Sequence, residues 1–173
     1  GLQMNLAHNA VRFFLGISRH YSRYGWIWML ALLIVVVLTH HWKLAYNYTN
    51  SLPQTLFAIQ LGQKDVERGD YVAFYPPKSA TAGNEMPFVK KVVCLPGERI
   101  RTYGQQIFCE DKPAALAKKI SLKGEPLQKI QDQLLGEDDY FVLGTHPDSF
   151  DSRYSNFGPI NRCRFIGKAY PIF

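Results

Sequence analysis

The chain has 173 residues, of which 47% are hydrophobic and 20% are charged. That length allows one modest domain with an appendage, and the composition excludes wholesale disorder because a packed core is feasible. The formal net charge of +6 fits an anionic partner, either a nucleic acid or a membrane surface, and the location of the charges decides between them.

A long uncharged apolar run occupies residues 24–38 and reads YGWIWMLALLIVVVL. Aromatic residues at its edges favour the membrane interface and extend the run toward the roughly 20 residues of a spanning helix. We predict an uncleaved transmembrane anchor over residues 24–42. The alternatives are a buried core helix, which disagrees with the lack of a polar face, and a cleaved signal peptide. Cleavage needs a pattern of small residues, and Ala45 is the one small residue of the stretch after the run.

Basic residues flank this run unequally. Arg12, Arg19 and Arg23 precede it, and Lys43 follows it closely. Because positive charge stays in the cytoplasm, we predict a single-pass membrane protein with a cytoplasmic N-terminus, which in a Gram-negative bacterium would lie in the inner membrane. Residues 1–23 would be cytoplasmic, and residues 43–173 would form a periplasmic domain. The predicted partner of the basic charge is therefore the lipid bilayer and not a nucleic acid.

The part after the anchor has the signals of a β-rich domain. Apolar and β-branched runs bounded by Gly and Pro predict strands, and a short run on each side of Gly104 predicts a hairpin. The stretch from residue 78 to residue 84 is small and polar, which predicts a surface loop. The expected strands are residues 71–75, 86–95, 99–103, 106–109, 139–143 and 164–170.

Residues 110–138 differ in composition, being rich in Lys, Ala, Leu and Gln. Pro126 can occupy a first helical turn, apolar residues follow it at helical spacing, and Gly136 can stop a helix. We therefore predict a mainly β fold, an antiparallel domain with a small helical excursion, preceded by one N-terminal transmembrane helix.

The chain contains three cysteines, Cys94, Cys109 and Cys163. An external domain permits one disulfide and leaves an odd thiol. Cys94 and Cys109 could face each other across a hairpin, but the sequence leaves the pairing open. No cysteine lies near a convincing set of metal ligands, so we predict neither a metal site nor a cofactor.

Two motifs carry residues with catalytic potential. Ser51 lies shortly after the anchor, and a serine hydroxyl needs an adjacent base to act as a nucleophile. Lys90 and Lys91 lie in an apolar strand, where alternation directs them to opposite faces. Burial lowers the pKa of a lysine because it penalises the charged form, and a neutral lysine can accept the serine proton.

A third motif reads GTHPDSFDSRY over residues 144–154. Together and in this order, the three motifs resemble those of the signal peptidase I family of Ser-Lys peptidases, over residues 49–170. That family has a Ser-Met-x-Pro box, a Lys-Arg-x-x-Gly-Leu-Pro-Gly-Asp box and a late Gly-Asp-Asn…Ser-x-Asp-Ser-Arg-Tyr box. The resemblance implies that Ser51 is the nucleophile and that Lys90 is the general base.

The same resemblance implies supporting roles for other residues. The Thr49 hydroxyl, with the Ser51 backbone N–H, would form the oxyanion hole. Ser149 would orient the lysine. Asp151 and Arg153 would form a structural ion pair.

The sequence departs from the family boxes at three places. Leu52-Pro53 replaces Met-x-Pro, Cys94 replaces a glycine, and Thr145-His146 replaces Asp-Asn. The Ser-Leu-Pro box of residues 51–53, the compact size and the SFDSRY stretch of residues 149–154 look more like the TraF-type conjugative-transfer peptidases. That likeness implies processing of a pilin precursor, in some systems with joining of the pilin ends, and implies conjugation or type IV secretion components as partners.

Three other functional hypotheses remain at this stage. One is a general signal peptidase I that removes signal peptides from secreted proteins. Another is a non-catalytic, membrane-anchored subunit of a conjugation or secretion apparatus. A histidine triad with His40, His41 or His146 is disfavoured, because the first two lie at the membrane edge and Asp151 is better explained by Arg153.

Overall fold

The computed structural model describes residues 2–47, 51–81 and 86–173, with side chains from residue 12 on. The chain divides into two units, Gly1–His40 and His41–Phe173, and each is described by itself.

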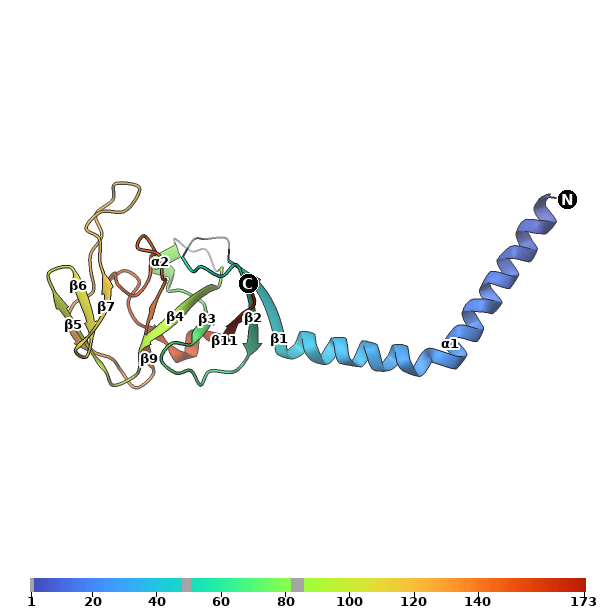
Figure 1. Ribbon diagram of the computed structural model, residues 1–173, viewed down its shortest axis with the longest axis horizontal. Helices are drawn as coiled ribbons and strands as arrows, with labels where there is room; N and C mark the ends of the chain where they lie inside the picture. Colours follow the sequence, from blue (N-terminus) through green and yellow to red (C-terminus); the bar gives the residue numbers. More distant parts are fainter. Residues whose placement is uncertain (1, 48–50, 82–85) are drawn as a thin grey trace. The chain divides into compact units, whose positions relative to one another are not determined.

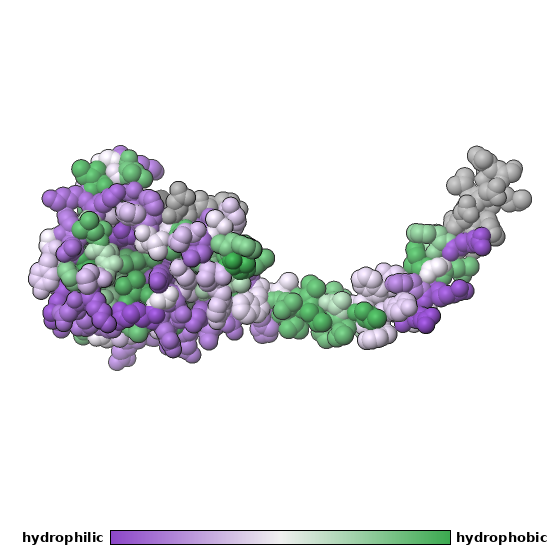
Figure 2. Space-filling model, in the orientation of Figure 1, coloured by the Kyte–Doolittle hydropathy of each residue, from purple (hydrophilic) through white to green (hydrophobic). Residues whose placement is uncertain are grey.

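The first unit is made of one helix, α1, which spans Leu2–His41. Its Arg12–His41 part is long and apolar enough to cross a membrane, with a mean hydropathy of 1.7 in its most apolar window. Figure 2 shows continuous apolar surface on the stretch that precedes the second unit and hydrophilic surface nearer the N-terminus. The helix therefore extends well beyond the predicted anchor at its N-terminal end.

The second unit is built on two antiparallel sheets (Figure 1). The larger sheet has the strand order β1-β2-β11-β3-β4-β9-β10. In that order its strands are Trp42–Tyr46, Leu56–Leu61, Phe165–Pro171, Tyr71–Phe74, Phe88–Cys94, Asp139–Leu143 and Ile160–Asn161. The smaller sheet has the order β7-β6-β5-β8, with strands Lys112–Leu116, Gln106–Cys109, Arg99–Tyr103 and Gln133–Leu134.

Strand β4 connects the core to the site. Its side chains alternate between buried and half-buried, so that Lys90, Val92 and Cys94 point inward. Val92 packs in one buried cluster with Val72 and Phe74 of β3. Cys94 belongs to a second cluster that includes residues of both sheets. The packing of β4 on both sides therefore holds Lys90 in a rigid element.

The predicted strands are confirmed in position, including the β5–β6 hairpin around Gly104. The prediction of a loop over residues 78–84 is wrong for its first part, because Lys78–Thr81 form a single helical turn, α2. The Ala80 N–H donates to the Pro77 carbonyl at 2.9 Å, which closes that turn. Residues 82–84 of this prediction lie outside the described residues.

The predicted helical excursion over residues 110–138 is wrong. This stretch holds strands β7 and β8 and a hairpin that is closed by an Ile120–Pro126 bridge. Its backbone groups bond to distant segments; for example, the Ile130 N–H donates to the Arg153 carbonyl at 2.8 Å. Tertiary pairing has overridden a weak local preference for helix.

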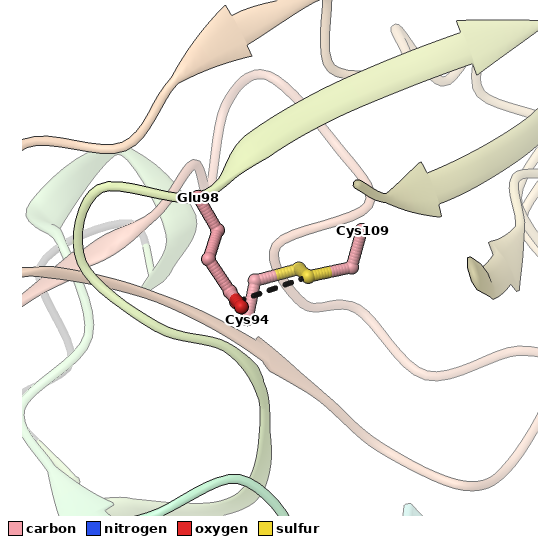
Figure 3. A group of neighbouring side chains, drawn as sticks. All are labelled: Cys94, Glu98 and Cys109. Carbon is pink, nitrogen blue, oxygen red and sulfur yellow. Dashed lines mark hydrogen bonds between the residues drawn. A yellow bond between two sulfur atoms is a disulfide. The ribbon is translucent and has the colours of Figure 1, made fainter. Parts of the chain in front are cut away.

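A disulfide joins Cys94 of β4 to Cys109 of β6, with the Cα atoms 5.8 Å apart, whereas Cys163 is free and exposed. This settles a pairing that the sequence left open. Figure 3 shows Glu98 beside the bridge, where its carboxylate lies 3.3 Å from the Cys109 sulfur. These three residues are close enough to suggest a metal site, but both sulfur atoms are bonded to each other and offer no thiolate ligand.

Candidate active site

One pocket of about 690 Å³ brings together residues from all three sequence motifs. Ser51, Lys90 and Ser149 line it, although 39 residues separate the first two in sequence and 59 the last two. Most of the other lining residues are apolar; they include Phe57, Met86, Phe88, Val89 and Phe150. The apolar lining leaves the charged form of the buried Lys90 poorly hydrated.

Lys90 is almost fully buried, with 4% of its surface exposed. Its Nζ donates a hydrogen bond to Ser149 Oγ at 2.8 Å and lies 5.8 Å from the centre of the Phe88 ring. The neighbouring Lys91 is half-buried on the opposite face of β4. The alternation expected from the sequence therefore separates the two lysines as predicted.

Burial lowers the pKa of Lys90 to about 8. The negative charge of Asp151 opposes this shift, and the positive charge of Arg153 adds to it. A lysine with this pKa is partly neutral near neutral pH and can accept a proton.

Ser51 lies half-buried in a turn just before Leu52. Leu52 has 4% of its surface exposed and packs with Phe57 and Ile59, which fixes the position of the turn. The Ser51 carbonyl accepts hydrogen bonds from the backbone N–H groups of Thr145, at 2.8 Å, and His146, at 3.3 Å. The serine is thus held against the segment that follows β9.

Gly144 makes this close approach possible. A Cβ at this position would lie 2.1 Å from Ser149 Oγ and 2.8 Å from the Ser51 carbonyl oxygen. No larger residue fits without moving one of them, since real Cβ contacts are far longer. The sequence motifs did not reveal this role, although the position of Gly144 directly after an apolar strand is a signal of a tight turn.

A buried ion pair supports the same segment. Arg153 donates through Nε and Nη2 to the two carboxylate oxygens of Asp151 at 2.8 and 2.7 Å. Its Nη2 also donates to the carbonyls of Gly144, at 3.1 Å, and His146, at 3.2 Å. Asp151 in turn accepts from the Gly144 N–H at 2.8 Å. Because every charge is matched by hydrogen bonds, this pair rigidifies the residues 144–149 at little net cost.

The sequence also raised Thr49, His146 and Asp151 as candidate site residues. Thr49 lies outside the described residues. His146 lines the pocket, but its Nδ1 accepts the Asp148 N–H at 3.2 Å. Asp151 bonds to Arg153, which disfavours a role for it as the acid of a histidine triad.

Comparison with known proteins adds to this geometry. Residues 17–173 match the family model described as signal peptidase, peptidase S26. The chain belongs to the signal peptidase family. As a member, it is a serine peptidase that processes exported proteins, and the apolar helix α1 agrees with membrane anchoring.

Two conjugation proteins are among the relatives. The chain is 29% identical to the conjugal transfer protein TraF of Agrobacterium tumefaciens over 143 residues, which cover 73% of this chain and 80% of the relative. It is 26% identical to the TraF protein of Agrobacterium fabrum over 144 residues, with the same coverage.

Signal peptidases also resemble the chain. The signal peptidase I of Leptolyngbya laminosa is 26% identical over 110 residues, which cover 61% of this chain and 52% of the relative. The crystal structure of a signal peptidase I from Enterococcus faecalis covers 62% of this chain and 98% of its own, with 26% identity and a TM-score of 0.40.

Proposed function

We propose that the chain is a membrane-anchored endopeptidase with a Ser51–Lys90 dyad, and that it cleaves an exported pilin precursor at the periplasmic surface of the bacterial inner membrane. The observation that carries this proposal is the buried Lys90, with its lowered pKa, in the same pocket as Ser51. A buried lysine with a lowered pKa does not serve as a solvated surface charge. Ionisable groups with shifted pKa values that lie in a cleft are typical of functional sites.

In this mechanism, neutral Lys90 takes the proton of Ser51 Oγ as the oxygen attacks the carbonyl carbon of the cleaved peptide bond. The ammonium that forms then gives its proton to the departing amine, which leaves an acyl-enzyme. A water molecule, deprotonated by the same lysine, hydrolyses the ester. Ser149 accepts a hydrogen bond from Lys90 Nζ, and this bond would orient the lone pair of the neutral amine toward Ser51.

The oxyanion hole is proposed to consist of the Ser51 N–H and the Thr49 hydroxyl. These donors would face the negative charge that develops on the carbonyl oxygen, where one donor contributes about 100- to 1000-fold to kcat.

The pocket suits an extended peptide. Strand β4 pairs with β3 from Phe88 to Lys91, but its register with β9 begins at Lys91. The stretch from Met86 to Val89 lines the pocket instead. An extended substrate added along this edge would use backbone hydrogen bonds for affinity and side-chain pockets for specificity.

Cleavage next to the bilayer is supported by strand β1, which directly follows α1. Its residues Trp42 and Leu44 are 38% and 72% exposed. The strand register places Leu44 in line with Ala58 and Tyr170 on one face. An outward face of this composition fits the lipid interface, where Trp and Tyr are favoured. The basic residues that precede the apolar run support a cytoplasmic N-terminus.

The pilin assignment is supported by the two relatives that are named conjugal transfer protein TraF. In such a system, conjugation or type IV secretion components would be partners, and attack of the pilin's own amine on the acyl-enzyme would join the ends instead of hydrolysing the ester. The alternative of a general signal peptidase is supported by the Leptolyngbya relative. A non-catalytic subunit is disfavoured, because Ser51, Lys90 and Ser149 line one pocket.

The test is incubation of the purified full chain with a propilin and, separately, with a secreted precursor, followed by mass spectrometry of the products. We expect cleavage of the propilin by the parent chain and none by Ser51→Ala or Lys90→Ala. A linear pilin product indicates hydrolysis of the acyl-enzyme. A product whose mass is one water less than that of the linear product indicates end joining. Equal cleavage of both precursors would favour the general signal peptidase. Full activity of the Ser51→Ala variant would refute the Ser51–Lys90 dyad.

A further inference from the structure

Residues 119–127 form a narrow hairpin, here called the 119–127 hairpin. The Leu127 N–H donates to the Lys119 carbonyl and the Ser121 N–H to the Glu125 carbonyl, each at 2.8 Å. Gly124, at a φ of 82°, closes the turn in a conformation that favours glycine. In Figure 1 this segment extends beyond β6 and β7 at the edge of the domain. The hairpin is thus an ordered projection and not part of either sheet.

The base of the 119–127 hairpin is tied to the segment that carries Ser149. On one side, the Lys118 N–H donates to the Tyr154 hydroxyl at 3.2 Å, and the Lys118 ammonium forms an ion pair with Asp148. On the other side, the Ser155 N–H donates to the Gln128 carbonyl at 2.8 Å. Two independent attachments therefore fix the hairpin relative to the catalytic residues.

The hairpin reaches the active-site pocket through Leu122. This leucine is 84% exposed, yet it lines the same pocket as Ser51, Asp148 and Phe150. Figure 2 shows apolar surface at the tip of the projection. Covering an exposed leucine side chain removes apolar surface from water, which is favourable, so an apolar group that contacts Leu122 in this pocket would add affinity.

We propose that the 119–127 hairpin is a substrate-binding element and that Leu122 contacts a bulky apolar side chain of the precursor near the cleaved bond. The occupant is a peptide segment because the pocket is continuous with Ser51 and Lys90. This inference rests on the proposed peptidase function and adds a specificity determinant to it. One apolar contact of this kind discriminates between substrates by about 10- to 200-fold.

The experiment measures cleavage preference and not cleavage alone. The full-length chain in detergent micelles is incubated with a peptide mixture from a digested bacterial proteome, and the cleaved positions are read by mass spectrometry. We expect the parent chain to prefer Leu, Met or Phe at one fixed position relative to the cleaved bond. Leu122→Ala should reduce that preference about tenfold and leave peptides with Ala at that position unaffected, whereas Leu122→Met should retain it.

The matched control is Leu134→Ala. Leu134 is 59% exposed on β8 and is absent from the residues that line the pocket, so its removal should leave the preference and the rate unchanged. The role of Leu122 would be overturned if Leu122→Ala kept the parent's cleavage preference, or if Leu134→Ala lost as much of that preference as Leu122→Ala. Neither result would affect the peptidase function. A parent chain that cleaves no more than Ser51→Ala would overturn the peptidase function and this inference together.

Discussion

At the scale of single residues, Lys90 must meet two opposing requirements. It must be buried enough to lose its proton readily, and it must keep a polar partner. The hydrogen bond to Ser149 Oγ at 2.8 Å supplies that partner. The cost of burying the charged form appears as the lowered pKa of Lys90, about 8.

This pKa predicts the pH dependence of catalysis. Lys90 is active when neutral, so kcat/KM should fall as pH decreases below about 8 and level off above it. About a tenth of the molecules carry neutral lysine one pH unit below its pKa. The measurement is kcat/KM against pH, which reports the free enzyme. His146→Ala should keep this acid limb, and its loss in that variant would refute the Ser-Lys mechanism.

The two adjacent lysines should behave differently when replaced. Lys90→Ala should abolish turnover because it removes the base. Lys91→Ala should retain most of it because Lys91 points to the other face of β4. Initial rates with one precursor compare the two variants directly. An inactive Lys91→Ala beside an active Lys90→Ala would show that the catalytic lysine has been misassigned.

Gly144→Ala tests the packing at the site. The added methyl would lie 2.1 Å from Ser149 Oγ, so Ser149 or the Ser51 segment must move. Misplacement of reacting groups by about 1 Å can cost on the order of 100-fold in rate, and we expect a loss of that size in kcat.

The matched control for this variant is Gly136→Ala. Its added methyl would meet the Asp139 carboxylate, 2.8 Å away, and that flexible side chain can turn aside. It should keep activity and thermal stability near those of the parent chain. Normal kcat in Gly144→Ala would mean that the catalytic geometry tolerates the shift.

At the scale of elements, β4 is the strand on which the site depends. It carries Lys90, pairs with β3 and β9, and ends at Cys94, whose disulfide connects it to β6 of the smaller sheet. The sequence separation of 15 residues corresponds to about 3 kcal/mol of loop entropy removed from the unfolded chain.

Replacing both bridged cysteines should therefore lower stability without removing the catalytic groups. We expect Cys94→Ala with Cys109→Ala to lose about 2 to 4 kcal/mol of unfolding free energy. Denaturant unfolding of the parent chain with and without a thiol reductant measures the same difference. Cys163→Ala is the control and should change nothing, and a double variant as stable as the parent would show that the bridge adds no stability.

At the scale of the whole molecule, the proposed topology places the second unit outside the cytoplasm. Cys163 is free and exposed, so a membrane-impermeant maleimide should label it in intact spheroplasts. A cysteine introduced as Ser18→Cys in a Cys163→Ser chain should react only after the membrane is opened. Labelling of the Ser18→Cys chain in intact spheroplasts, with protection of Cys163, would reverse the orientation.

Much of the architecture could be predicted from local patterns. The apolar run of residues 24–38 predicted a helix long enough to span a membrane, and apolar, β-prone runs bounded by Gly and Pro predicted strands β3, β4 and β9. The alternation of side chains along a strand separated Lys90 from Lys91. These features follow from the composition and order of neighbouring residues, which the chain itself contains.

The sequence by itself determined the chemistry that is available: a serine, a lysine in an apolar strand, and an Asp–Arg pair in an ordered set of motifs. Only the tertiary structure decided that residues 119–127 form a hairpin and not a helix, that Cys94 pairs with Cys109, and that Gly144 must lack a side chain. The physical reason is that each of these depends on a partner distant in sequence. Gln128 bonds to Ser155, and Gly144 touches both Ser51 and Ser149. No local propensity encodes contacts of that kind, because they arise when separate segments pack together.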